Sequence, residues 1–200
     1  MQLLEIRKKL KKELDKDRYE HTIGVMFTAA GLAMANEAPV DQAMLAGLLH
    51  DCAKNIPSSE KIALCKKKHY PISNAERENP SLLHAKAGAV LARSKYHVTD
   101  REILHAIEVH TTGAPDMNLL DKIIYVADYI EPNRNKAPRL AEIRRIAFAD
   151  IDRCVAEILY DTLFYLHKGK KLIDPVTEET FLFYRDYLPD ERRNMRFEEM

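Results

Sequence analysis

The sequence predicts an all-α protein. Along most of the chain, apolar side chains recur every three or four positions, the spacing that gathers them on one face of a helix. Prolines and capping residues divide this pattern into segments of helical length. Two stretches that could be strands, YPIS and KLID, are too short to form a sheet, and no alternating pattern elsewhere competes with the helical one.

The first part of the chain is predicted to form four helices. Leu3, Ile6, Leu10 and Leu14 mark the first helix, which packs either on the domain or against a second subunit. The second helix is rich in small and apolar residues, and Asp41 can cap the third. The expected ranges are about 1–16, 18–36, 41–54 and 59–68.

The next stretch, HYPISNAERENP, is predicted to be a loop because it contains two prolines. Beyond it, Thr99 and Glu102 are spaced as a capping box. The remaining helices are expected over about 81–96, 99–110, 118–130, 138–148, 151–168 and 178–187. We expect one domain over 1–200, with a core of about 15–185 and a polar tail of about 190–200.

Composition excludes several classes of protein. Charged residues make up 31% of the chain, and the formal net charge is zero, so no overall field favours DNA, RNA or a membrane surface. The number of cysteines is odd, at three, with no CxxC pair, which favours a reducing compartment. The first residues do not resemble a signal peptide, and no apolar run approaches a membrane span. We therefore expect a cytoplasmic protein.

Several histidines and carboxylates stand in unusually apolar surroundings. One buried histidine can be satisfied by a backbone carbonyl, which is the ordinary explanation for any single case. Five such places on five predicted helices are harder to explain in this way, because the groups satisfy one another only around a cation such as a divalent metal. The places are His21, the pair His50-Asp51, His84, His110 and Asp128.

The pair in LLHDCAK, residues 48–54, indicates where such a metal would lie. Neighbours on a helix point about 100° apart, so His50 and Asp51 can serve one centre only if it lies off the helix end. Lys54 is three residues beyond Asp51, and Arg18 is three residues before His21. Each could be a solvated surface cation, but together they favour an anionic substrate such as a phosphate.

The order His, His-Asp, Asp resembles the pattern of the HD-domain metal-dependent phosphohydrolases. The surrounding segments RYEHTIGV, LLHDCAK, NPSLLHAKAGAV, AIEVHTTGAP and VADYIEPNR together resemble the bacterial YqeK family, over about residues 15–185. That family consists of HD-domain symmetrical diadenosine tetraphosphate hydrolases. The resemblance implies an all-α HD fold with a two-metal centre in its core, usually iron. It also implies cleavage of diadenosine tetraphosphate to two ADP by metal-activated water.

The resemblance also assigns roles to individual residues. The first metal would be held by His21, His50, Asp51 and Asp128, and Asp51 would bridge to a second metal held by His84 and His110. Asp51 and Lys54 are the expected catalytic residues, and Lys54 would also contact phosphate. Further substrate contacts are expected from Arg18, Thr111, Thr112, Gly113 and Arg134. The donor set suits iron, manganese, cobalt, nickel or zinc better than calcium or magnesium.

Other interpretations remain open from the sequence. The chain could act on another nucleotide, such as a nucleoside monophosphate or a hyperphosphorylated guanosine nucleotide. It could also be a regulatory module that binds metal or nucleotide without catalysis, and a homodimer is compatible with the first helix. We expect the aromatic residues of ILYDTLFYLH, residues 158–167, to be core rather than an adenine-binding surface, although an aromatic residue that stacks on adenine could come from this region. We expect Cys52 to point away from the metals.

Overall fold

The computed structural model describes residues 2–193, and within this range it contains helices and no strand, which confirms the all-α prediction. The longer helices are α1 (Leu3–Glu13), α2 (Lys16–Ala35), α3 (Val40–Leu49), α4 (Ser58–Lys67), α6 (His84–Ser94), α7 (Arg101–Val109), α8 (Leu119–Ile130), α9 (Leu140–Ala147), α10 (Ile151–Lys168) and α11 (Pro175–Tyr184). The short ones are α5 (Asn74–Glu78), α12 (Asp190–Arg193) and the 3-10 turns η1 (Pro80–Leu83) and η2 (Arg185–Tyr187).

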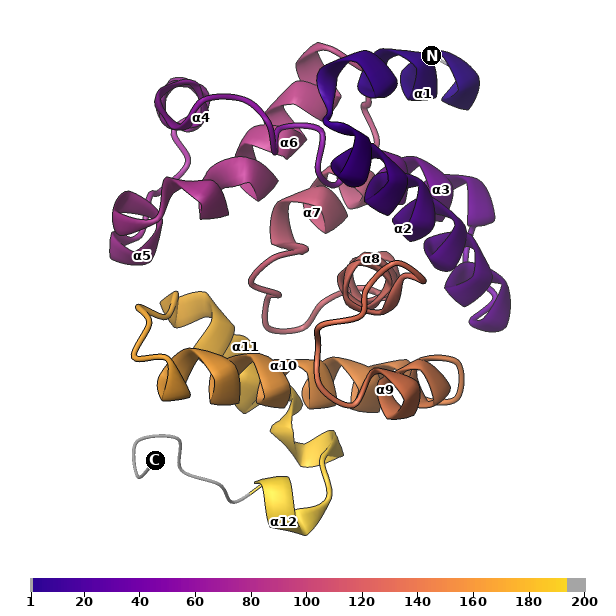
Figure 1. Ribbon diagram of the computed structural model, residues 1–200, viewed down its shortest axis with the longest axis vertical. Coiled ribbons are helices and arrows are strands. Elements are labelled where there is room, and N and C mark those ends of the chain that lie inside the picture. Colours follow the sequence, from indigo (N-terminus) through magenta and orange to yellow (C-terminus); the bar gives the residue numbers. More distant parts are fainter. Residues whose placement is uncertain (1, 194–200) are drawn as a thin grey trace.

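The helices surround one central pair, α7 and α8 (Figure 1). Helix α2 packs against α3 and α8, while α7 contacts α3, α6 and α8. Helix α10 crosses the lower part of Figure 1 and packs against α8, α9 and α11. The main cluster of buried apolar side chains extends from Ile6 to Leu188. This packing brings the C-terminal ends of α3 and α7, the start of α6 and the second turn of α2 towards the last turns of α8.

The first helix packs on the domain. Ile6 and Leu10 are buried members of the main core cluster. At the end of the helix, Glu13 lies 2.8 Å from the ammonium of Lys95 and accepts a 2.9 Å hydrogen bond from the Tyr96 hydroxyl. The sequence allowed this helix to pack either on its own domain or against a second subunit, and in the structure it packs on its own domain.

The third helix differs from its prediction at both ends. It begins at Val40 after Pro39, so Asp41 lies within its first turn, and no side chain caps it. It ends at Leu49, five residues before Lys54, and residues 50–54 form tight turns. In these turns the backbone N–H of Lys54 donates to the carbonyl of Asp51 at 2.9 Å. The helix therefore ends directly before the His50-Asp51 pair, and not at about residue 54 as predicted.

One capping prediction and one loop prediction also need correction. The Asp100 carboxylate, not Thr99, caps α7, and it accepts from the backbone N–H groups of Glu102 and Ile103. The segment predicted as a loop contains α5, whose start is a capping box of Ser73 and Glu76. The prolines in that segment lie outside α5 and so do not prevent a single helical turn.

The C-terminal helices deviate in range and in burial. The last long helix begins at Pro175 rather than 178, because Asp174 caps it and proline suits the first helical position. Of the aromatic residues of 158–167, which we expected to be core, Tyr160 is half-buried and packs against the main core cluster, whereas Phe164 and Tyr165 are 37% and 60% exposed and are not core.

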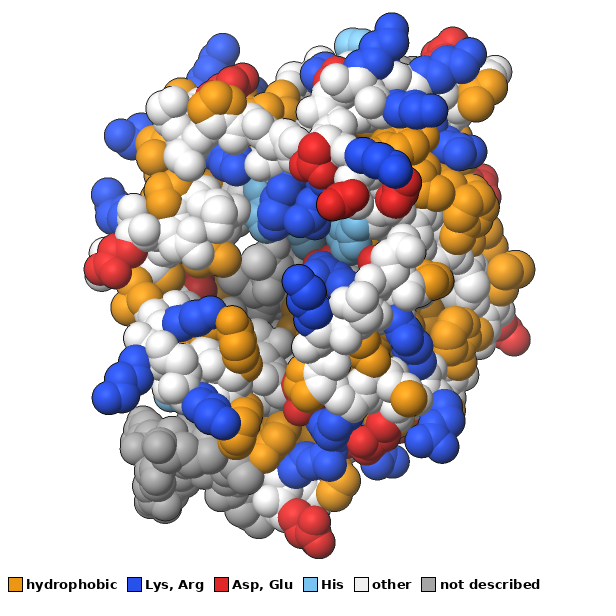
Figure 2. Space-filling model, viewed as in Figure 1, with side chains coloured by type: hydrophobic (Ala, Val, Ile, Leu, Met, Phe, Trp, Pro, Cys, Tyr) orange, Lys and Arg blue, Asp and Glu red, His pale blue; other side chains and the backbone are white. Residues whose placement is uncertain are grey.

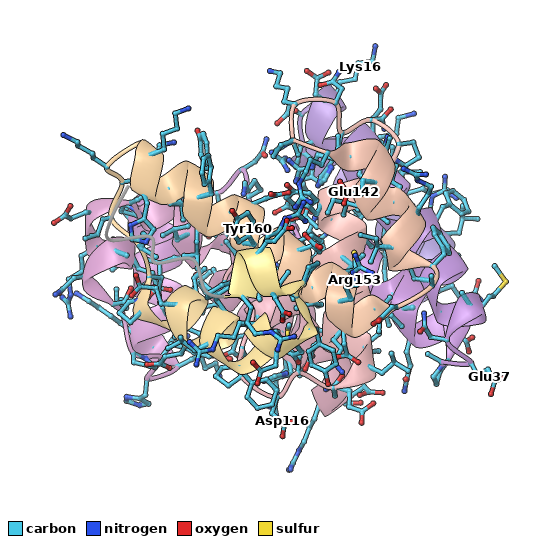
Figure 3. All side chains as sticks on the ribbon, turned by 90° about the horizontal axis from the view of Figure 1, so that it is seen from below. Lys16, Glu37, Asp116, Glu142, Arg153 and Tyr160 are labelled. Atoms are coloured by element: carbon cyan, nitrogen blue, oxygen red, sulfur yellow. The ribbon has the colours of Figure 1, made fainter. Side chains whose placement is uncertain are left out.

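An ion pair attaches helix α12 to helix α10. Arg192 pairs with the buried Glu157 of α10, which also accepts a 2.9 Å bond from Arg139. Figure 3 views this lower side and labels Tyr160 of α10, over whose ring the Arg192 guanidinium lies at 5.7 Å. The predicted tail of 190–200 thus begins with a helical turn, and its residues 194–200 lie outside the described range. The single domain over 1–200 stays a prediction.

Gly113 lies in the turn after α7 and packs against Thr180 of α11, and we expect its replacement to destabilise the fold. Its φ is +68°, and an added Cβ would lie 2.8 Å from Cγ2 of the buried Thr180. Gly113→Ala should lower the free energy of unfolding by about 1–3 kcal/mol, because strain and overpacking add. Urea unfolding measures this effect.

Gly31→Ala is the matched control for this substitution. A Cβ there meets the Phe148 ring at an ordinary 3.6 Å. The helical backbone of α2 favours alanine over glycine by up to about 1 kcal/mol. Equal unfolding midpoints for the two variants would contradict the assigned role of Gly113.

Candidate metal centre

Six side chains from five elements meet in the middle of the molecule. His21 comes from α2, His50 and Asp51 follow α3, His84 begins α6, His110 follows α7, and Asp128 lies in the last turns of α8. All six are the ligand candidates of the sequence analysis, and all are buried except Asp128, whose side chain is 22% exposed. Figure 2 shows a hollow on this face, with histidines at its upper end and lysines and arginines around its rim.

Three of the histidine rings are oriented in the same way. The Nδ1 atoms of His50, His84 and His110 lie 2.6–2.7 Å from the carbonyl oxygens of Gly47, Ser81 and Ile107, each three residues earlier. A carbonyl only accepts, so Nδ1–H donates, and in the neutral ring Nε2 carries a lone pair. The rings thus turn Nε2 towards one another, and two such pairs approach closely: His21 with His50 at 3.3 Å and His84 with His110 at 3.1 Å.

Asp51 lies between the two histidine pairs. Its Oδ1 is 3.1 Å from Nε2 of His84 and 3.8 Å from Nε2 of His110. Its Oδ2 is 3.4 Å from Nε2 of His50 and 3.8 Å from that of His21. Asp51 is 2% exposed, and its Oδ1 is a buried oxygen without a hydrogen-bond partner. Buried lone pairs that face one another need a cation between them, so these residues fit a divalent metal.

Three groups of side chains could each hold a metal ion, because within each group the ligand atoms lie within 4.8 Å of one another. These groups are His21, His50 and Asp51; Asp51, His84 and His110; and His50, His110 and Asp128. The first two sets share Asp51 and correspond to the two halves expected from the sequence. Asp128 joins the first half through its Oδ1, which is 3.0 Å from Nε2 of His21. The cluster is therefore suited to divalent metal binding.

The protonation states of three side chains in the cluster favour metal binding. Burial alone would raise the pKa of Asp51, but His50 and His84 hold that pKa well below its usual value. Burial acts likewise on Asp128, and His21 and Arg134 lower its pKa well below the usual value. Burial and the neighbouring His84 and His50 lower the pKa of His110 to about 3. At neutral pH both carboxylates are ionised and His110 is neutral, the forms that bind a metal.

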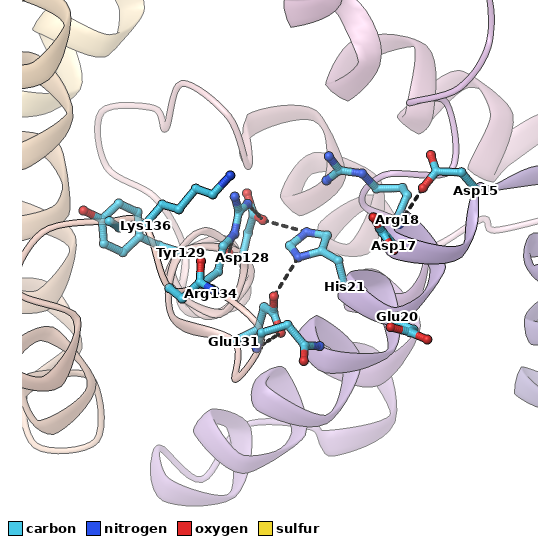
Figure 4. A pocket seen from close by; sticks show the side chains of 13 residues that line it. Asp15, Asp17, Arg18, Glu20, His21, Asp128, Tyr129, Glu131, Arg134 and Lys136 are labelled. Carbon is cyan, nitrogen blue, oxygen red and sulfur yellow. Dashed lines mark hydrogen bonds and ion pairs between the residues drawn. The ribbon is translucent and has the colours of Figure 1, made fainter.

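Cations surround the cluster as the sequence predicted. The guanidinium of Arg18 lies 2.6 Å from Oδ2 of Asp51, and that of Arg134 lies 2.6 Å from Oδ1 of Asp128. The Lys54 ammonium is 3.1 Å from Nε2 of His84 and 3.8 Å from Oδ1 of Asp51. Burial, followed by the charges of Arg18 and Arg134, lowers the pKa of Lys54. Arg18 and Arg134 also line a pocket of about 530 Å³ beside His21 and Asp128 (Figure 4).

The three residues after the helix end of α7 differ in position. The Thr111 hydroxyl lies 3.3 Å from Nε2 of both His84 and His110. Thr112 turns its hydroxyl to the carbonyl of Gly113, and Gly113 packs on Thr180. Thr111 and Thr112 line a second cavity of about 500 Å³. Of this predicted trio, only Thr111 reaches the cluster with its side chain.

Glu131 belongs to the cluster and was missed in the sequence. It is 1% exposed, and its Oε1 lies 3.1 Å from Nδ1 of His21. Its Oε2 accepts a 2.8 Å bond from the backbone N–H of Asn133, and Gly24 leaves room for the carboxylate. Figure 4 shows His21 between Glu131 and Asp128. The available signal was its place one helical turn after Asp128, next to a proline.

We expect Glu131 to position His21 for the metal. Glu131→Gln keeps the shape but removes the charge that orients the ring and raises its basicity, so metal affinity should fall about 10- to 100-fold. Competition against a chromophoric chelator measures this affinity. The control is Glu178→Gln, on the exposed side of α11. An unchanged affinity in Glu131→Gln would remove Glu131 from the site.

Cys52 turns away from the cluster, as expected. Its sulfur lies 3.5 Å from the carbonyl oxygen of Gly88, to which the thiol donates. Burial and the nearby Asp51 raise the pKa of this thiol, so it stays protonated and is a poor metal ligand.

Comparison with known proteins agrees with this geometry. A family model described as the HD domain matches residues 18–133, which include all six ligand candidates. The symmetrical bis(5'-nucleosyl)-tetraphosphatase of Bacillus subtilis is 40% identical over 175 residues, covering 88% of this chain and 91% of that protein. The protein of the same name from Staphylococcus aureus is 34% identical, covering 82% of this chain and 84% of its own.

A solved structure has the same fold. It is a crystal structure from Clostridium acetobutylicum, described as a predicted HD superfamily hydrolase involved in NAD metabolism. It is 34% identical, with a TM-score of 0.89, and the match covers 94% of this chain and 99% of that one. From the HD-domain match, these identities and the clustered His and Asp side chains, we conclude that the chain belongs to the HD-domain family of symmetrical bis(5'-nucleosyl)-tetraphosphatases.

Proposed function

We propose that this protein hydrolyses diadenosine tetraphosphate symmetrically to two ADP. The names of the Bacillus subtilis and Staphylococcus aureus relatives support the substrate class and the position of cleavage. The observation that carries the proposal is Asp51, whose two oxygens face two different histidine pairs inside a ring of cations. A bridging carboxylate of this kind suits a pair of metal ions acting on a polyphosphate.

The proposed ligands fall into two halves around Asp51. His21, His50, Asp51 and Asp128 would hold one ion, and Asp51, His84 and His110 the other. Imidazole and carboxylate donors suit first-row transition ions, and we propose two of them, iron in the native protein, with manganese, cobalt, nickel and zinc as substitutes. Counting metals per chain by elemental analysis tests the number and the identity.

The side chains of this protein would bind and orient the polyphosphate. Divalent ions, when bound, supply positive charge and a water of lowered pKa. Lys54 would contact a phosphate oxygen and stabilise the negative charge that grows there during the reaction. Arg18 and Arg134 now pair with Asp51 and Asp128, and once ions neutralise these carboxylates the two guanidiniums can bind phosphate oxygens in bidentate fashion. Thr111 lies beside His84 and His110, where its hydroxyl can hydrogen-bond to a phosphate oxygen.

Product analysis tests the proposal. The purified protein is incubated with diadenosine tetraphosphate, with and without added iron or manganese, and the nucleotides are separated. ADP as the sole product is the expected result. ATP with AMP would overturn the symmetrical position of attack. No product, with metal confirmed as bound, would favour another nucleotide substrate or a regulatory module.

The cell compartment is also a proposal. Cys52, Cys65 and Cys154 are free and buried, which supports the reducing cytoplasm. None of the described helices is long and apolar enough to span a membrane. Two further predictions stay untested: that the protein has no nucleic-acid partner, and that it can form a homodimer.

A further inference from the structure

A large cavity lies beside the candidate metal centre. It measures about 950 Å³ and opens between the segment that joins α8 to α9 and helix α10. Tyr129, Arg134 and Lys136 line both this cavity and the pocket around His21 and Asp128. Arg134, whose guanidinium is 2.6 Å from Asp128, stands at the border of the two spaces. The cavity therefore adjoins the site where the phosphates are proposed to bind.

One wall of this cavity is aromatic. Tyr129 comes from α8, and Tyr160, Phe164 and Tyr165 come from α10. The rings of Tyr160 and Phe164 stack with centroids 6.4 Å apart at 25°. Large aromatic rings are mostly buried in folded proteins, yet Tyr165 is 60% exposed here and Phe164 is 37% exposed. Partly exposed aromatic rings that line a cavity suit a planar aromatic ligand.

The ring of Tyr165 is also held in place. The Lys171 ammonium lies 4.2 Å from the ring centroid and 2.6 Å from the hydroxyl oxygen. A ring restrained in this way loses little further freedom when a ligand stacks on it. Tyr165 is therefore the part of the wall that we choose for a test.

Five of the six charged residues that line the cavity are basic, and the sixth, Asp161, pairs with Arg139. Arg139 and Arg192 line the cavity, but both are committed to buried carboxylates of α10. Lys136 and Lys168 also line it, and neither forms an ion pair with another residue in 2–193. These two cations remain for the anionic part of a ligand. Aromatic faces beside free cations are the usual means of binding a nucleotide without reading its base by hydrogen bonds.

We infer that this cavity binds one nucleoside half of the substrate, with the base stacked on the aromatic wall. The inference rests on the proposed function and deepens it. The phosphates then extend past Arg134 towards Asp51, and Lys136 and Lys168 add attraction along the way. Stacking tolerates any base, so the cavity selects for a nucleoside rather than for adenine alone.

Tryptophan fluorescence tests the inference directly, because the natural chain contains no tryptophan. Tyr165→Trp places one indole on the wall. The full chain is titrated with ADP and, separately, with inorganic pyrophosphate. ADP should quench the emission saturably, and pyrophosphate should not. Tyr187→Trp is the control, because Tyr187 is 49% exposed and lines neither cavity. An ADP response absent from Tyr165→Trp, or equal in the control, would overturn the inference.

Kinetics separate this inference from the proposed function. Tyr165→Ala should raise KM for diadenosine tetraphosphate about tenfold, because the stacking of one base is lost in the ground state and the transition state alike. If the natural chain cleaves the dinucleotide while Tyr165→Ala has an unchanged KM and Tyr165→Trp ignores ADP, the inference alone fails. If ADP quenches Tyr165→Trp but the natural chain does not cleave the dinucleotide, the proposed function alone fails.

Discussion

Replacing Asp51 with asparagine is expected to reduce hydrolysis at least about 1,000-fold, because one carboxylate serves both halves of the centre. An amide has a single neutral oxygen, and its NH2 group would face the second histidine pair and repel a cation. The four Nε2 atoms now within 3.8 Å of Asp51 would lose their shared anion. Bound metal, measured by elemental analysis after gel filtration, should fall together with activity.

Asp152→Asn is the matched control for this substitution. Asp152 is half-buried in the first turn of α10, pairs with Lys122 of α8 at 2.7 Å and is not one of the ligand candidates. It undergoes the same chemical change, and its metal content and turnover should stay at those of the natural chain. Full metal content and near-natural turnover in Asp51→Asn would mean that Asp51 does not join the two halves.

Replacing Lys54 with methionine is expected to lower kcat/KM about 100- to 1,000-fold while metal stays bound. The methionine keeps most of the apolar stem but removes the charge that stands 3.1 Å from Nε2 of His84. Since that charge repels a metal ion, its loss should leave metal affinity unchanged or slightly increased. Activity and metal content therefore separate the phosphate contact of Lys54 from the ligands around it.

Lys66→Met provides the comparison, because Lys66 is an exposed lysine on α4. Its kinetics should match those of the natural chain. A loss of metal in Lys54→Met would show that Lys54 supports the ligands rather than the substrate. Equal kcat/KM values for the two methionine variants would exclude Lys54 from catalysis.

The six ligand candidates could be predicted because each is a local anomaly. A histidine or an aspartate in an otherwise apolar helix has to be explained by a partner, and the sequence shows the anomaly even though it hides the partner. The close approach of His84 to His110 and the division of Asp51 between two pairs depend on helix packing. These features emerged only in the structure.

Glu131 was missed because it is not an anomaly in its local sequence. Its neighbours Ile130 and Pro132 suggest nothing more than a helix end, and its partner His21 is 110 residues away in the chain. The exposure of Phe164 and Tyr165 in α10 was not predicted either. Helical spacing indicates which residues share a face, but part of the face that carries Tyr160 and Phe164 lines a cavity. The predicted range of the third helix, about 41–54, was too long, because the chain turns after Leu49.

The carbonyl bonds of His50, His84 and His110 have a consequence for how the site forms. Each of these rings takes its direction from the turn of backbone that carries it, so its aim is set as soon as that turn forms. His21 alone depends on a remote acid, Glu131. Three of the four histidine ligand candidates therefore depend on local structure alone. A four-residue turn of this kind, transferred to another helical bundle, would keep the orientation of its histidine ring. Building such a centre anew is then chiefly a problem of placing helices.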